Sequence, residues 1–129
     1  MKLGMMMKAL LPLAAVALMT GCATKPQALY NYGTYSESYY AYKQDTSAEN
    51  LLAMQQAILT AIENANESVS KRVAPGMYAN LGYIYFKQGD TKQAVHYFEM
   101  EKSLYPESAH FMDRVIEKVR KAEAKGAKS

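Results

Sequence analysis

The stretch from Pro75 to Ser108 constrains the fold most strongly, because its large and small apolar residues follow the spacing of two helices joined by a short break. Gly89 suits the left-handed position just after a helix. Asp90 or Thr91 then suits the cap of the next helix, which Pro106 ends. The segment therefore predicts a helix–turn–helix unit.

The same segment resembles the tetratricopeptide repeat, a helical hairpin of 34 residues. The positions that match the repeat signature are Tyr78 in place of the usual Trp, Leu81, Gly82, Tyr85, Ala94, Phe98 and Pro106. The resemblance implies small residues, Gly82 and Ala94, where the two helices cross closely. Glu101 departs from the signature, which has a small residue there, so we expect looser packing at Glu101 or a position facing solvent.

One repeat cannot bury its own apolar faces, so neighbouring helices are expected on both sides. Upstream, a helix over residues 47–68 with Ser47 as its N-cap is predicted by the apolar stripe of Leu51, Met54, Ile58, Ile62, Ala65 and Val69. Downstream, an amphipathic capping helix is predicted by Phe111, Met112, Val115, Ile116 and Val119. We expect an all-α fold of about five helices, arranged as tetratricopeptide-like hairpins over residues 34–123.

Six tyrosines occur between residues 30 and 43. Thr34 and Glu37 have the spacing of a capping box, which predicts a short helix after Gly33. One face of that helix would carry Tyr35, Tyr39 and Tyr42 and pack against the 47–68 helix. An exposed partner-binding patch is the alternative role for the tyrosines off this stripe, which are Tyr30, Tyr32 and Tyr40.

The first 22 residues, MKLGMMMKALLPLAAVALMTGC, have a basic start and an apolar run about half as long as a membrane span. Cys22 is the only cysteine, so no intramolecular disulfide can form. Met-Thr-Gly-Cys resembles the lipobox of bacterial lipoproteins, which implies cleavage between Gly21 and Cys22, a diacylglycerol on the Cys22 sulfur and acylation of the new N-terminus. In bacterial lipoproteins, an aspartate directly after the lipidated cysteine is associated with retention at the inner membrane. This chain has Ala23 there, so the resemblance favours the outer membrane. The alternative is an ordinary secreted protein with a stray cysteine.

This organisation predicts a signal peptide over residues 1–21, a lipidated tether over 22–33 and a flexible basic tail over 124–129. Removing Lys2 and Lys8 leaves 13 basic residues against 12 acidic ones, which argues against a general polyanion or nucleic-acid binder. The basic residues gather near the C-terminus, where they form either a solvated face or a contact with anionic lipid headgroups.

Residue types that carry chemistry are sparse. His96 and His110 have no cysteine or carboxylate partners at metal-ligand spacing, and no phosphate-binding loop or nucleophile motif occurs. We therefore expect no catalytic residue, no metal and no cofactor, and we expect that the chain is not an enzyme.

The tetratricopeptide resemblance also implies a binding groove, because the first helix of each such repeat lines the concave surface. Carried onto the matching positions, the groove residues would be Ala79, Tyr83, Phe86 and Lys87. In the alternative, Tyr83 and Phe86 only pack against the upstream helix.

Residues 30–40, 75–82, 101–108 and 111–113 resemble a family of small Gram-negative lipoproteins, domain of unknown function 4810. Its members have no established activity and are often encoded beside other lipoproteins, one of them related to the curli-secretion pore. The resemblance implies an outer-membrane lipoprotein facing the periplasm, with protein partners, that acts as an interaction module or accessory subunit of an envelope assembly. The alternative is a periplasmic peptidoglycan- or glycan-binding module that uses exposed tyrosines.

Overall fold

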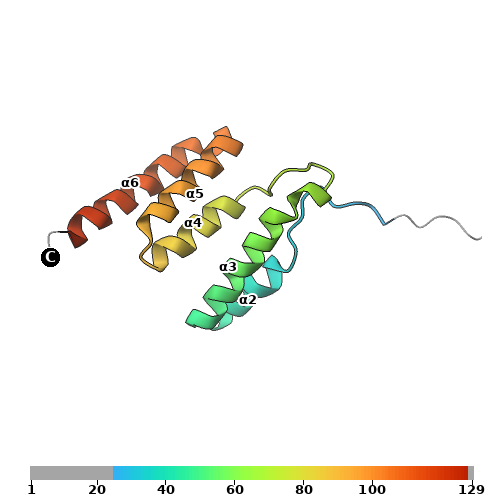
Figure 1. The fold of residues 1–129 in the computed structure, drawn as a ribbon, viewed down its shortest axis with the longest axis horizontal. Coiled ribbons are helices and arrows are strands. Elements are labelled where there is room, and N and C mark those ends of the chain that lie inside the picture. Colours follow the sequence, from blue (N-terminus) through green and yellow to red (C-terminus); the bar gives the residue numbers. More distant parts are fainter. Residues whose placement is uncertain (1–24, 128–129) are drawn as a thin grey trace, which may run out of the picture.

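The computed structural model describes residues 25–127, and this part of the chain is all-α, with its helices packed as hairpins (Figure 1). The signal peptide, its cleavage site and Cys22 lie outside the described residues. The helices are α2 (Tyr35–Gln44), α3 (Ala48–Glu63), α4 (Met77–Lys87), α5 (Thr91–Leu104) and α6 (Ala109–Gly126). Two short 3₁₀ turns, Ala65–Glu67 and Pro106–Ser108, lie in the connections.

Local sequence signals fix several helix ends. The Ser47 side chain accepts a hydrogen bond from the Asn50 amide, which confirms this predicted N-cap. Of the two candidates for the later helix, Asp90 is the N-cap, because its side chain accepts a hydrogen bond from the Gln93 amide. Gly89 adopts a φ of 84° after α4, a left-handed conformation that glycine adopts at little cost.

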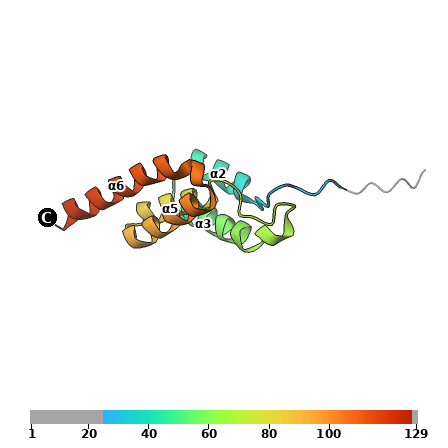
Figure 2. The ribbon, with the colours of Figure 1, turned by 90° about the horizontal axis from the view of Figure 1, so that it is seen from above.

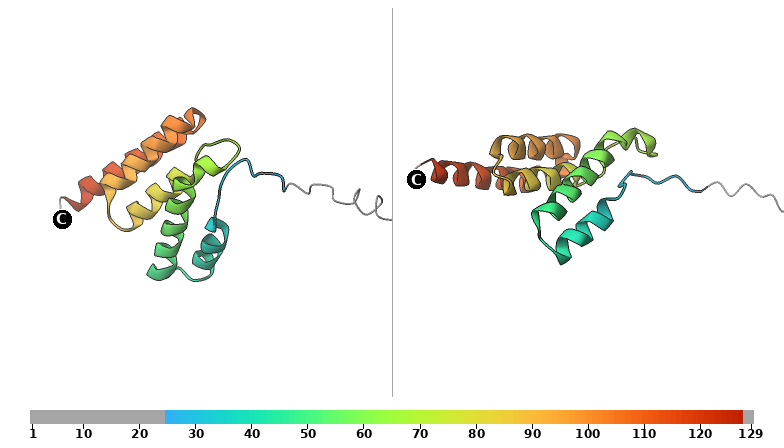
Figure 3. Two further views of the ribbon diagram at one scale, coloured as in Figure 1. Left: turned by 45° about the vertical axis from the view of Figure 1, so that its right-hand side comes forward. Right: turned by 60° about the horizontal axis from the view of Figure 1, so that its bottom comes forward.

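The helices form two groups. Helices α4, α5 and α6 lie side by side with nearly parallel axes, and the α2–α3 hairpin is tilted against them (Figures 1 and 3). One core cluster joins α3 to α4 and consists of Met54, Ile58, Ala74, Met77, Leu81 and Ile84. The other joins α5 to α6 and consists of Ala94, Phe98, Met112, Ile116 and Val119. Partly buried residues of α4 also pack against the second cluster, so α4 links the two.

Gly82 is required by the close crossing of α4 and α5. A Cβ atom at this position would lie 2.8 Å from two ring carbons of Phe98 and 3.0 Å from the carbonyl oxygen of Ala94. Both distances are shorter than ordinary van der Waals contacts, so the small residue expected here has a direct steric cause.

Glu101 differs from its expectation, because it is only 3% exposed and does not face solvent. Its carboxylate accepts hydrogen bonds from the amides of Gly76 at 2.7 Å and Ala79 at 3.4 Å. The N-cap of α4 is Gly76, which has no side chain to offer, and Glu101 satisfies these donors from α5.

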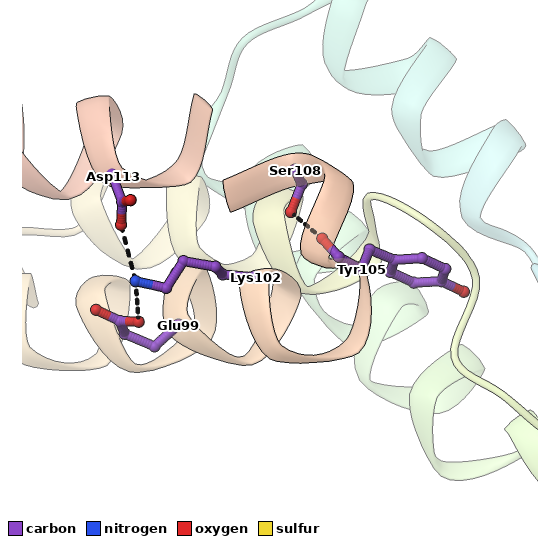
Figure 4. Close-up of polar contacts among 5 residues, drawn as sticks. All are labelled: Glu99, Lys102, Tyr105, Ser108 and Asp113. Atoms are coloured by element: carbon purple, nitrogen blue, oxygen red, sulfur yellow. Dashed lines mark hydrogen bonds and ion pairs between the residues drawn. The ribbon is translucent and has the colours of Figure 1, made fainter. Parts of the chain in front are cut away.

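An ion pair between side chains joins α6 to α5. Lys102 of α5 forms ion pairs with Glu99 at 2.8 Å and with Asp113 of α6 at 2.7 Å (Figure 4). At the turn between the helices, the Ser108 hydroxyl donates to the Tyr105 carbonyl at 2.7 Å (Figure 4). These contacts set the position of α6 along α5.

Three helix predictions need correction. Helix α3 ends at Glu63 instead of residue 68, because Ala65–Glu67 tightens into a 3₁₀ turn and leaves Val69 exposed. Thr34 occupies the N-cap of α2 but makes no side-chain cap bond, since its ψ of 19° is not the extended conformation of capping residues. The C-terminal helix runs to Gly126, beyond the predicted domain end at residue 123.

The predicted tether also needs correction, because its second half lies on the helical domain. The amides of Val69 and Ser70 donate to the carbonyls of Ala28 and Leu29, each at 3.1 Å. Asn31 donates from its side chain to the Asn64 carbonyl at 3.1 Å. Residues 27–33 are therefore part of the folded unit, and residues 25–26 lie at the end of the described chain far from the C-terminal end (Figure 2).

Candidate functional site

Two neighbouring cavities share Asn80 and Tyr83 in their linings, and we call the two together the α2–α4–α6 groove. The first measures about 380 Å³ and is lined by Tyr35, Tyr39, Tyr42, Lys43, Thr46, Met54, Asn80, Tyr83 and Lys87. The second measures about 200 Å³ and is lined by Ala79, Asn80, Tyr83, Phe98, Phe111, Met112 and Val115. Asn80 and Tyr83 line both, so α4 forms the floor that the two cavities share.

Exposed aromatic rings give the groove its apolar surface. Tyr83 is 49% exposed and Phe111 is 63% exposed, and Tyr39 is exposed on the α2 side. Large exposed aromatic side chains that gather around one depression are unusual on a monomeric surface and are typical of interaction sites.

The first cavity is also basic. Lys43 lies over the ring of Tyr39 at 5.9 Å from its centroid, and Lys87 lies over Tyr83 at 5.6 Å. No carboxylate is among the residues that line this cavity. The two ammonium groups stand on opposite walls, α2 and α4, and give the cavity a positive potential.

A hydrogen bond across the groove joins α2 to α4. Asn80 donates from its side chain to the Tyr35 hydroxyl at 2.9 Å. Burial, and to a lesser degree the neighbouring Tyr39, raise the pKa of Tyr35 above its ordinary value of 10.0, so this phenol is neutral at physiological pH. The groove therefore combines apolar rings, two cations and neutral hydrogen-bonding groups.

The four residues predicted for a groove are placed differently by the structure. Tyr83 and Lys87 line the first cavity, and Ala79 lines the second. Phe86 lines neither cavity, since it packs against the cluster between α5 and α6. Phe86 therefore lies outside the two cavities, on the part of α4 that packs against this cluster.

Sequence reasoning missed several groove residues. Phe111 and Met112 were both expected in the apolar stripe of the last helix, but only Met112 is buried and Phe111 is exposed. Tyr39 was expected to pack on the next helix and is exposed instead, beside Lys43. The clustering of tyrosines between residues 30 and 43 was the available signal for this side of the groove.

The three tyrosines outside the Tyr35–Tyr39–Tyr42 face of α2 differ in their exposure to solvent. Tyr40 and Tyr32 are exposed, as the partner-patch alternative requires, whereas Tyr30 is half-buried against the α3–α4 core cluster. Tyr30 and Tyr32 contact each other edge to face and line a third cavity of about 470 Å³ with Asn31 and Ser68.

Residues 25–127 contain neither a metal-type cluster nor a membrane-spanning helix. Within that range, no group of three or more His, Cys, Asp or Glu side chains could hold a metal ion. His96 and His110 are both exposed. None of the helices in this range is long and apolar enough to cross a bilayer.

The fold and groove define an all-α protein of paired helices with an aromatic, basic surface. Residues 29–115 match the family described as Domain of unknown function (DUF4810), and the chain belongs to that family. Comparisons with curated proteins and with solved structures gave no match.

Proposed function

We propose that this protein is an outer-membrane lipoprotein that faces the periplasm and binds a protein segment in the α2–α4–α6 groove, as an interaction module or accessory subunit of an envelope assembly. The observation that carries the proposal is the pair of neighbouring aromatic cavities that share the exposed Tyr83 in their linings. Other lipoproteins, including a relative of the curli-secretion pore, are the partners that the family resemblance suggests.

The tetratricopeptide-like interpretation supports the groove. Gly82, Ala94 and Phe98 make the close α4–α5 crossing that this repeat uses. In such repeats the first helix of each hairpin lines the binding surface, and here α2 and α4 would be those helices. Helix α6 would be the terminal capping helix, with its charged side in solvent.

The groove chemistry favours a segment that carries both apolar side chains and a carboxylate. The rings of Tyr39, Tyr83 and Phe111 would contact the apolar side chains. Lys43 and Lys87 would pair with the carboxylate, because no acidic residue lines that cavity to neutralise them.

The test is photo-crosslinking in cells from position Tyr83, with position Leu52 as a matched control. Leu52 is 62% exposed on α3 and lines none of the cavities described. A dominant envelope protein captured from position 83 and absent from position 52 is the expected result. A folded, outer-membrane-localised probe that captures the same proteins from both positions would overturn groove binding.

Membrane attachment through Cys22 rests on the lipobox-like Met-Thr-Gly-Cys stretch. Two or three acyl chains hold a protein stably on a bilayer, whereas one chain does so only marginally. Globomycin treatment should block cleavage before Cys22, and Cys22→Ser should release the protein from the outer-membrane fraction. Unchanged processing under globomycin would refute the lipoprotein assignment.

A glycan-binding role remains a second candidate because of the cavity at Tyr30 and Tyr32, which pairs phenol rings with the polar groups of Asn31 and Glu67. Aromatic faces beside amides and carboxylates suit sugar rings. Pelleting with purified sacculi tests this role. Binding that Tyr32→Ala leaves unchanged would exclude it, since Tyr32 is the more exposed of the two rings.

A further inference from the structure

The segment that precedes α2 is anchored to the connection between α3 and α4. Two side chains of this segment donate to backbone carbonyls: Gln27 to Glu67 at 2.8 Å and Asn31 to Asn64 at 3.1 Å. Two backbone amides donate in the other direction, Val69 to the Ala28 carbonyl and Ser70 to the Leu29 carbonyl, each at 3.1 Å. The segment therefore has a defined place on the domain from residue 27 onward.

Two exposed aliphatic residues lie on the two segments that these backbone hydrogen bonds join. Leu29 is 59% exposed and Val69 is 54% exposed, and the backbone bonds above join their two strands of chain. The tertiary fold gives neither side chain a buried position, so both remain available for contact with something outside the domain. We call these two residues the leader-end surface, where the leader is the segment of residues 22–26 that precedes the anchored residues.

The leader is too short to let this surface move far from Cys22. Only four residues, 23–26, separate Cys22 from the first anchored residue, Gln27, and the five steps of extended chain from 22 to 27 span at most about 18 Å. The polar region of one leaflet is roughly 5–8 Å thick, by difference between the whole bilayer and its hydrocarbon core. An acylated Cys22 would therefore hold Leu29 and Val69 within reach of the lipid headgroups.

We propose that the leader-end surface, Leu29 with Val69, contacts the lipid bilayer and fixes the orientation of the domain on the membrane. The inference rests on the proposed acylation of Cys22. Lys25, Lys71 and Glu67 are exposed in the same part of the chain, so charges of both signs accompany Leu29 and Val69.

The proposed orientation has a consequence for the basic C-terminal end. The last turns of α6, which include Arg120 and Lys121, lie at the opposite end of the described chain from residues 25–27 (Figure 2). Helix α6 alone spans about 27 Å, at 1.5 Å per residue. The basic tail would then point away from the anchoring leaflet, and contact between this tail and anionic headgroups is not expected.

Site-directed fluorescence on the full acylated protein tests the proposal. Cys22 is the only cysteine, so its acylation leaves the cysteine of Leu29→Cys, Val69→Cys or Leu52→Cys as the sole thiol for an environment-sensitive dye. Leu52 is the matched control, because it is also an exposed leucine, at 62%. The vesicles contain phosphatidylethanolamine and phosphatidylglycerol, with and without nitroxide-labelled lipid.

The expected result is blue-shifted emission and nitroxide quenching at positions 29 and 69, with neither at position 52. Lengthening the leader by about 20 Gly and Ser residues should reduce the quenching at both positions. Absence of quenching at 29 and 69, in protein that floats with the vesicles and carries acyl chains by mass, would overturn the proposal and leave the anchor intact. A mass that reveals an unmodified Cys22 would overturn both the bilayer contact and the proposed acylation.

Discussion

The carboxylate of Glu101 lies 2.7 Å from the amide nitrogen of Gly76 and accepts its hydrogen bond, although 25 residues separate the two in the chain. Its second oxygen accepts from Ala79, in the first turn of α4. Helix N-termini carry a partial positive charge, so a carboxylate there is stabilising. A residue of α5 thus caps α4 and locks the two helices of one hairpin in register.

Glu101→Gln should lower the free energy of unfolding by roughly 1–3 kcal/mol, because a buried, charge-assisted hydrogen bond is weakened and one acceptor oxygen becomes a donor. Glu99→Gln is the control, since Glu99 is about half exposed and its ion pair to Lys102 is at the surface. Urea denaturation followed by circular dichroism measures both. Equal losses in the two variants would contradict the capping role.

Gly82→Ala should also destabilise the protein, by a net amount of up to about 2 kcal/mol. The added methyl group would press on the Phe98 ring and the Ala94 carbonyl, which costs about 1–3 kcal/mol, and alanine returns up to about 1 kcal/mol of helix propensity. Gly126→Ala has nothing within 4 Å of its added atom and should be neutral or slightly stabilising. Thermal unfolding measures both variants. If the close α4–α5 crossing is the cause, the melting temperature should fall in Gly82→Ala and stay unchanged or rise slightly in Gly126→Ala.

The features that sequence reasoning found are those determined by neighbours along the chain. Ser47, Gly89 and Asp90 act on helix ends one to three residues away, and Gly82 follows from a hairpin whose spacing is local. The all-α class follows from the same periodicity.

The features that were missed depend on contacts between distant segments. Whether Phe111 or Met112 is buried depends on how α6 rotates on α5, and both fit one amphipathic helix. The burial of Glu101 requires amide donors on another helix. Anchoring of residues 27–33 depends on the 3₁₀ turn at 65–67, which no spacing rule predicts.

Tyr105 should make the stability of the fold depend on pH in the alkaline range. Burial first, and the neighbouring Tyr30 phenol second, raise the pKa of Tyr105 from 10.0 to about 12. The folded state keeps a proton that the unfolded state releases. The associated stability is therefore complete below pH 10 and is lost as the pH rises from 10 to about 12.

Tyr105→Phe separates this effect from general alkaline denaturation. The variant loses the 2.6 Å hydrogen bond from the Tyr105 hydroxyl to the Val73 carbonyl, which costs roughly 0.5–1.5 kcal/mol at neutral pH. Its urea midpoint should then fall less steeply than that of the original protein above pH 10. Parallel pH profiles for the two proteins would show that Tyr105 is not the titrating group.

Groove binding predicts that Phe111 contributes to capture from a probe at Tyr83, because both rings line the smaller cavity from different helices. Phe111→Ala should reduce the crosslink yield at position 83 about tenfold, a change of about 1.4 kcal/mol in binding free energy. Stability should hardly change, since Phe111 is largely exposed. Leu52→Ala removes a comparably exposed side chain outside the groove and should leave the yield unchanged. If both variants reduce the yield equally, or neither does, the partner does not occupy the cavity between α4 and α6.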